Sequence, residues 1–113
     1  MTSRRQNRVS ELLQEEIGLL AQELNDPILA YVSVTGVEVT PDLGHAHVFV
    51  GHLGDADEKT AVLKALARAA GYIRRELAER GVLRYVPELS FHWDDSMSRG
   101  SRIDELLRQL GLG

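Results

Sequence analysis

The sequence has no cysteine and few aromatic residues. The lack of cysteine excludes disulfide bonds, thiolate metal sites and cysteine nucleophiles together. Aromatic residues make up only 5% of the chain, and no aromatic run of the kind that stacks RNA bases on an open sheet is present. Leu89, Phe91 and Trp93 share one parity along a predicted strand, so we assign all three to the core rather than to base stacking.

Long apolar segments are also missing. The N-terminus, MTSRRQNRVSELLQEE, is charged throughout, so it predicts neither a signal peptide nor an anchor. No later segment is long and apolar enough to cross a membrane. With 43% hydrophobic and 27% charged residues, residues 1–113 have the composition of one globular domain. We therefore expect a soluble, cytoplasmic, monomeric protein.

Recognisable catalytic motifs are missing as well. The sequence has no phosphate-binding loop of the Walker type, and Ser96 and Ser98 lack the Gly-x-Ser-x-Gly context of a nucleophile. His45 and His47 share one strand face, but no obvious third metal ligand accompanies them. The sequence predicts a protein that is not an enzyme and that needs no metal or cofactor.

Positive charge is unevenly distributed. The net charge is −4, yet residues 1–8 hold three arginines and no acid, and residues 9–58 hold ten acids and no lysine or arginine. Residues 59–84 then hold seven basic and two acidic residues. Such segregation predicts one basic and one acidic surface. Solvated helix faces are the alternative explanation for any single charge run.

Helical periodicity follows the N-terminus. Ser3 and Gln6 form a capping box that predicts the start of a helix. Asn25 and Asp26 precede Pro27, and the residue before a proline disfavours helical geometry, so the helix should end there. The apolar face of this helix comprises Val9, Leu12, Leu13, Ile17, Leu20 and Leu24.

Two strands are predicted next, at residues 31–39 and 45–53. A turn at residues 40–44, which contains proline and glycine, joins them as an antiparallel hairpin. The valines of the first strand change parity halfway along it. Because a regular strand cannot place all of them on one face, we expect a β-bulge at Gly36.

A broken helix and a third strand complete the core elements. Asp57 is a candidate cap for a helix that runs to about Ala70, Gly71 interrupts it, and a continuation at residues 72–80 ends at Gly81. A strand follows Pro87, and a last short helix is expected at residues 101–110. The predicted fold class is α+β: a KH-like domain of type II order (α-β-β-α-kink-α-β) whose three-stranded sheet is covered by helices on one face, with a short C-terminal helix.

A row of cations lies on the outer side of the predicted broken helix. At about 100° per residue, Lys64, Arg68, Gly71 and Arg75 fall close together, opposite the apolar face. A glycine between cations would let a sugar–phosphate backbone approach the helix closely. The alternative, of equal weight on these residues alone, is that Gly71 permits a kink and the cations only increase solubility.

Arg4, Arg5 and Arg8 lie where the helix dipole is already positive and acids are preferred. Arginines at a helix start break this preference without visible compensation, which often marks a functional site. Because helix N-termini and arginines both attract anions, we expect this site to bind phosphate. A frayed terminus with hydrated charges is the other reading. The full set of predicted RNA-binding residues is Arg4, Arg5, Arg8, Lys64, Arg68, Gly71, Arg74, Arg75, Arg80 and Arg84.

The same residues carry a family resemblance. Over residues 8–110 the chain closely resembles the ribosome-binding factor A family, through the stretches RVSELLQEEI, VSVTGVEVTPDLGHAHVFV, LKALARAAGYIRRELAER and LRYVPELSFHWDDSMSRGSRIDELL. In that family an Ala-x-Gly kink replaces the Gly-x-x-Gly clamp of ordinary KH domains. The matching residues here are Ala69, Ala70 and Gly71.

The resemblance implies a function that composition and spacing do not give. It implies binding to the immature 30S small ribosomal subunit, contact with its 16S rRNA and a late role in maturing that RNA. It also implies relevance to cold adaptation and release by a ribosome-associated GTPase. The alternative is a protein-interaction module in which the acidic first helix and hairpin bind a basic ribosomal protein.

Overall fold

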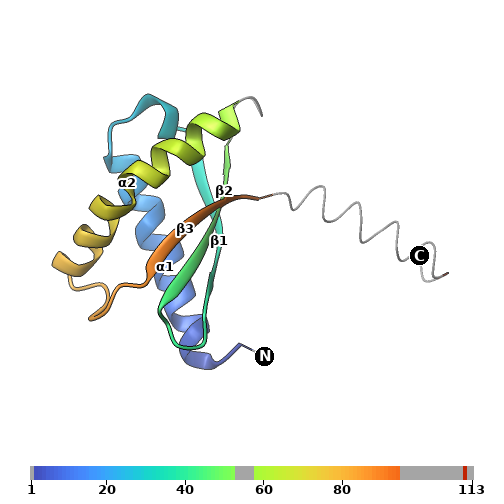
Figure 1. Ribbon diagram of the computed structural model, residues 1–113, viewed down its shortest axis with the longest axis vertical. Coiled ribbons are helices and arrows are strands. Elements are labelled where there is room, and N and C mark those ends of the chain that lie inside the picture. The colour runs from blue at the N-terminus through green and yellow to red at the C-terminus, as the bar shows by residue number, and fades with distance from the viewer. Residues whose placement is uncertain (1, 53–57, 95–110, 112–113) are drawn as a thin grey trace.

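A computed structural model describes residues 2–52, 58–94 and 111 of the chain. Within them, helices and strands form the two layers of an α+β fold, as Figure 1 shows. The predicted helix at residues 101–110 and the predicted cap Asp57 lie outside the described residues. In chain order the elements are α1 (Arg4–Glu23), the 3-10 turn η1 (Pro27–Leu29), β1 (Val32–Val39), β2 (His45–His52), α2 (Lys59–Glu79) and β3 (Glu88–Trp93).

The sheet has the strand order β1-β2-β3, with β2 antiparallel to β1 and parallel to β3. The register between β1 and β2 shifts between Val34 and Gly36. This shift confirms the bulge expected at Gly36. Because of it, Val32, Val37 and Val39 are all buried despite their different parity.

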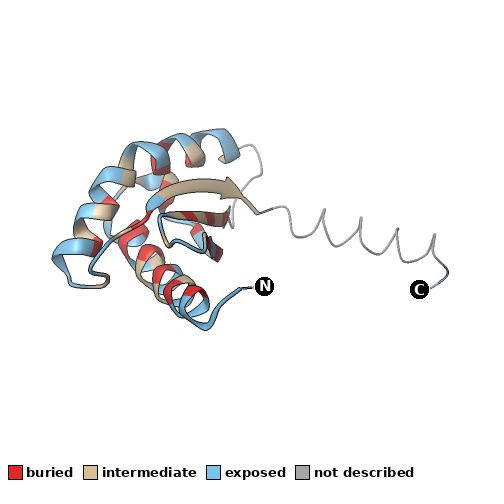
Figure 2. Ribbon diagram, turned by 60° about the horizontal axis from the view of Figure 1, so that its bottom comes forward, coloured by how far each residue is buried: buried red, intermediate tan, exposed pale blue. Residues whose placement is uncertain are grey.

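One hydrophobic core lies between the sheet and the two helices. Figure 2 shows the buried residues concentrated where helices and sheet face each other. Leu89, Phe91 and Trp93 pack against this core, as their shared parity predicted. The helices of the described residues include none long and apolar enough to cross a membrane. The buried side chains that α1 and α2 contribute to the core are Val9, Leu13, Ile17, Leu20, Val62, Ala65, Leu66, Ile73 and Leu77.

The start of α1 is fixed both locally and to the sheet. The predicted capping box is present: Gln6 N donates to Ser3 Oγ at 3.1 Å, and Ser3 N donates to Gln6 Oε1 at 2.9 Å. The Gln6 Nε2 group also donates to the Val39 carbonyl oxygen at 2.8 Å. At the other end of α1, Gln22 Nε2 donates to the Val32 carbonyl oxygen at 3.1 Å. Glutamine amides of α1 therefore satisfy carbonyl groups of β1, a strand at the edge of the sheet.

The predicted break in the second helix is wrong, because α2 is one uninterrupted α-helix of 21 residues. Glycine in a helix interior costs about 1 kcal/mol relative to alanine, which weakens a helix without ending it. Here Leu66 and Ile73 are buried on either side of Gly71. Their burial in the shared core offsets that cost.

The end of α2 is a glycine-terminated turn, as predicted. Gly81 has φ +71°, a left-handed conformation that glycine adopts without steric cost. Val82 N donates to the Leu77 carbonyl oxygen at 3.0 Å. The chain then passes through residues 83–87 into β3.

Candidate nucleic-acid interface

The outer side of α2 carries the row of cations that the sequence predicts. Lys64, Arg68 and Arg75 are exposed, and we call them the α2 cation row. They lie opposite residues such as Ile73, which is fully buried. None of the three forms an ion pair with a carboxylate in the part of the chain that the structure describes. Their charge is therefore available to an external anion.

Gly71 lies within this row and is exposed. A Cβ atom built at Gly71 would meet no atom within 4 Å, apart from neighbouring atoms of its own helix. The space above the helix backbone at this position is thus open. A sugar–phosphate backbone could approach α2 more closely here than at a position with a side chain.

The N-terminal arginines are held in regular structure. Arg4, Arg5 and Arg8 belong to α1, whose start is capped by Ser3 and Gln6. All three arginines are exposed, and no acidic residue occupies the first turn of α1. They make no ion pair with any carboxylate among residues 2–52 and 58–94.

These arginines border a groove that local sequence patterns do not predict. The groove has a volume of about 930 Å³ and lies between the start of α1, the β1–β2 turn and the loop before β3. We call it the basic groove. It brings Arg84, which is distant in sequence, to the same place as the N-terminal arginines. Its lining residues are Arg4, Arg5, Arg8, Val9, Asp42, Leu43, Gly44, Leu83, Arg84, Tyr85, Val86 and Pro87.

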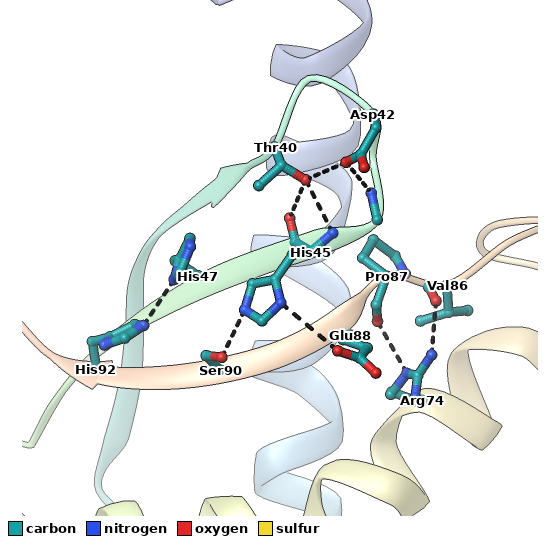
Figure 3. A network of polar contacts seen from close by, with 11 residues as sticks. Thr40, Asp42, His45, His47, Arg74, Val86, Pro87, Glu88, Ser90 and His92 are labelled. Carbon is teal, nitrogen blue, oxygen red and sulfur yellow. Dashed lines mark hydrogen bonds and ion pairs between the residues drawn. The ribbon is translucent and has the colours of Figure 1, made fainter.

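The turn on one side of the groove is fixed by its own hydrogen bonds (Figure 3). Asp42 Oδ1 accepts from Thr40 Oγ1 at 2.7 Å and from Gly44 N at 2.9 Å. These two donors, the Thr40 hydroxyl first, hold the pKa of the Asp42 carboxyl below its ordinary value of 3.8. Asp42 is therefore an anion that is already hydrogen-bonded within its own turn.

Arg74 and Arg80, two of the predicted RNA-binding residues, have partners within the protein. Arg74 donates from Nε to the Pro87 carbonyl oxygen at 3.0 Å and from a terminal nitrogen to the Val86 carbonyl oxygen at 3.1 Å. Arg80 pairs with Glu23 at 2.7 Å and with Glu76 at 3.1 Å. Hydrogen bonds to Glu23 raise the pKa of Arg80 further. Both arginines have structural roles here that the sequence did not indicate.

The predicted RNA-binding cations that are exposed and have no carboxylate partner within the described residues fall into two groups. None of Lys64, Arg68 and Arg75 lines the basic groove, whereas Arg84 and the N-terminal arginines do. Of the cations that the sequence assigned to one basic surface, Arg4, Arg5, Arg8 and Arg84 line the basic groove, and the α2 cation row lies outside its lining. The predicted set of RNA-binding residues did not include Tyr85, which is 80% exposed and also lines the basic groove. The available signal was an aromatic residue directly after an arginine, in a short segment between a helix-ending glycine and a proline.

The comparison with protein-family models decides which family the chain represents. Residues 5–107 match the model described as ribosome-binding factor A. The chain belongs to the ribosome-binding factor A family. Curated ribosome-binding factor A from Halothermothrix orenii is 43% identical over 111 residues, covering 97% of this chain and 91% of that protein. The protein of that name from Thermomicrobium roseum is 48% identical over 111 residues, covering 97% of this chain and 86% of that protein.

Solved structures of ribosome-binding factor A share the fold. The crystal structure of the Thermus thermophilus protein superposes with a TM-score of 0.68 at 26% identity, covering 77% of this chain and 93% of the other. A Thermus thermophilus homology model, fitted into a cryo-electron microscopy map of a 30S–RbfA complex, superposes with a TM-score of 0.62 at 25% identity. The match covers 80% of this chain and 92% of the chain of that homology model.

The open face of the sheet in this ribosome-binding factor A family member carries histidines. His47 Nδ1 lies 2.9 Å from His92 Nε2, and His45 Nε2 lies 2.7 Å from Ser90 Oγ (Figure 3). His45 Nδ1 lies 4.0 Å from a carboxylate oxygen of Glu88. Among the described residues, no group of three or more potential ligands could hold a metal ion. The histidines therefore act here as hydrogen-bonding partners across neighbouring strands.

Proposed function

We propose that the chain binds the immature 30S small ribosomal subunit, contacts its 16S rRNA and assists the late maturation of that RNA without catalysing a reaction. The observation that carries the proposal is the α2 cation row, whose three side chains are exposed and unpaired within the described residues. Membership of the ribosome-binding factor A family supports it, as does the fit of a relative into a 30S–RbfA map.

The proposed contact relies on phosphates and shape. Cations that replace condensed counterions contribute affinity without reading base sequence. The open surface at Gly71 would allow the RNA backbone to approach α2 between Arg68 and Arg75. The net charge of −4 does not oppose this contact, because the acids concentrate elsewhere, for example at exposed Glu11 and Glu15 on α1.

The finer parts of the proposal follow the family. The domain is proposed to be KH-like with type II order, and the sequence helix, strand, strand, helix, strand of the described residues supports this. The protein is proposed to act as a cytoplasmic monomer, to matter for growth in the cold, and to leave the subunit with help from a ribosome-associated GTPase.

Sedimentation of a cell extract tests the proposal. The chain should travel with free small subunits rather than with complete ribosomes, and Lys64→Ala/Arg68→Ala/Arg75→Ala should move it to the top of the gradient. The matched control is Glu11→Gln/Glu15→Gln, which removes two exposed charges of the opposite sign and should leave co-sedimentation unchanged. The reverse pattern, with loss only in the glutamine variant, would instead support a basic protein partner for the acidic surface.

A further inference from the structure

Tyr85 is the most exposed of the large hydrophobic residues in the described part of the chain. Its side chain is 80% exposed, and the Arg84 guanidinium carbon lies 5.6 Å from its ring centroid. Leu83 and Val86, the neighbours of this pair in sequence, pack against the core. The loop is therefore anchored on both sides of a dipeptide that is turned outward. A single exposed aromatic ring is common on protein surfaces, but this one lines the basic groove together with four arginines.

The charges around Tyr85 are predominantly positive. Arg4, Arg5, Arg8 and Arg84 line the basic groove together with a single carboxylate, that of Asp42. That carboxylate accepts hydrogen bonds within its own turn and pairs with none of the arginines at 4.0 Å or less. An anionic ligand would meet four guanidinium groups that have no carboxylate partner within the described residues, and one of them, that of Arg84, lies over the Tyr85 ring.

The walls of the groove are held in place before any ligand binds. Arg74 fixes the loop by donating to the carbonyl oxygens of Val86 and Pro87. Glu88 N donates to the Gly44 carbonyl oxygen at 3.0 Å, which joins this loop to the β1–β2 turn. Arg74 is thus a positioning residue for Arg84 and Tyr85. A preformed site binds without the entropic cost of ordering its loops.

We propose that the basic groove binds an unpaired nucleotide of the RNA, with its base stacked on Tyr85 and its flanking phosphates held by the arginines. This inference rests on the proposed function and names the RNA element that the second group of cations recognises. Bases inside a duplex have no free face, whereas an unpaired base can be splayed out and stacked on an aromatic ring. Val9, Leu43 and Leu83 also line the groove and add apolar character to it. An acidic peptide would use the arginines but would gain little from Tyr85.

Fluorescence anisotropy with two labelled RNAs tests this site. One is an unstructured single-stranded octamer, and the other is a fully paired hairpin. Tyr85→Ala should weaken binding of the octamer roughly 5- to 100-fold, which is the range for loss of one aromatic–base stack. Tyr85→Phe keeps the ring and should stay within about twofold of the parent protein, and binding of the hairpin should barely change in either variant.

Tyr31→Ala is the matched control, because Tyr31 is 61% exposed but lies outside the groove. It should leave binding of both RNAs unchanged. Octamer binding that is unaffected by Tyr85→Ala, or competition by polyglutamate as strong as that by RNA, would overturn the inference. The proposed function can hold even if this inference fails. Loss of small-subunit binding in Lys64→Ala/Arg68→Ala/Arg75→Ala would support the proposed function whatever the result for Tyr85→Ala. A parent protein that does not co-sediment with small subunits would instead overturn the proposed function itself.

Discussion

The contact between Gln6 and β1 is expected to contribute a measurable part of the free energy of unfolding. Gln6 is only 7% exposed, and its amide nitrogen donates to the Val39 carbonyl oxygen at 2.8 Å. Gln6→Ala removes this donor and also the acceptor for Ser3 N in the capping box. An unsatisfied buried carbonyl costs about 1–3 kcal/mol, and half of a capping box adds about 0.5 kcal/mol. The expected loss is about 1.5–3.5 kcal/mol of unfolding free energy.

Gln22→Ala is the internal control for this prediction. Gln22 also lies on α1 and donates to a β1 carbonyl oxygen, that of Val32, at 3.1 Å, but its side chain is exposed. Water can replace the lost amide there, so the expected loss is under about 1 kcal/mol. Both variants exchange glutamine for alanine within α1, so the difference in helix propensity largely cancels.

Urea denaturation followed by circular dichroism measures both losses. For a domain of this size, Gln6→Ala should also lower the melting temperature by about 6–15 °C. Equal losses in the two variants would show that the buried hydrogen bond to Val39 contributes nothing specific.

The two glycines at the middle and the end of α2 should respond to alanine in opposite directions. Gly71→Ala places a methyl group in open space within a regular helix and should stabilise the protein by about 0.5–1 kcal/mol. Gly81→Ala forces a side chain into φ +71° and should destabilise the protein by about 1 kcal/mol. Urea denaturation measures both changes. Arg80 holds the pKa of Glu23 below its ordinary value of 4.5, so the contribution of the pair to stability is present above pH 4.5 and is lost as the pH falls through the lowered pKa. Glu23→Gln should therefore differ from the parent protein in urea midpoint at pH 7 and converge with it towards pH 3; a constant difference across that range would contradict the role of the ion pair.

Local patterns in the sequence predict most of the described fold. The capping box at Ser3 and Gln6 and the bulge beside Gly36 both depend on a few neighbouring residues, and both are confirmed. The break at Gly71 is wrong because the buried positions of α2 keep a constant helical phase across the glycine. Leu66 and Ile73 are seven residues apart, close to two full turns, and this spacing favours a continuous helix.

The candidate site was only partly predictable, because partners distant in sequence decide which cations are free. Arg80 pairs with Glu23, which lies 57 residues away, and no local pattern indicates that contact. Arg74 is similarly occupied by carbonyl groups of the loop before β3. The basic groove gathers three separate segments of the chain, so its shape exists only in the folded protein.

The salt dependence of binding to purified small subunits decides whether the α2 cation row binds phosphates. For the parent protein, log affinity should fall steeply and linearly with log salt concentration. For Lys64→Ala/Arg68→Ala/Arg75→Ala, this slope should be smaller by about 2–3, since each phosphate contact contributes close to one unit. An unchanged slope in that variant would show that the α2 cation row does not contact phosphates and would refute the proposed mode of RNA binding.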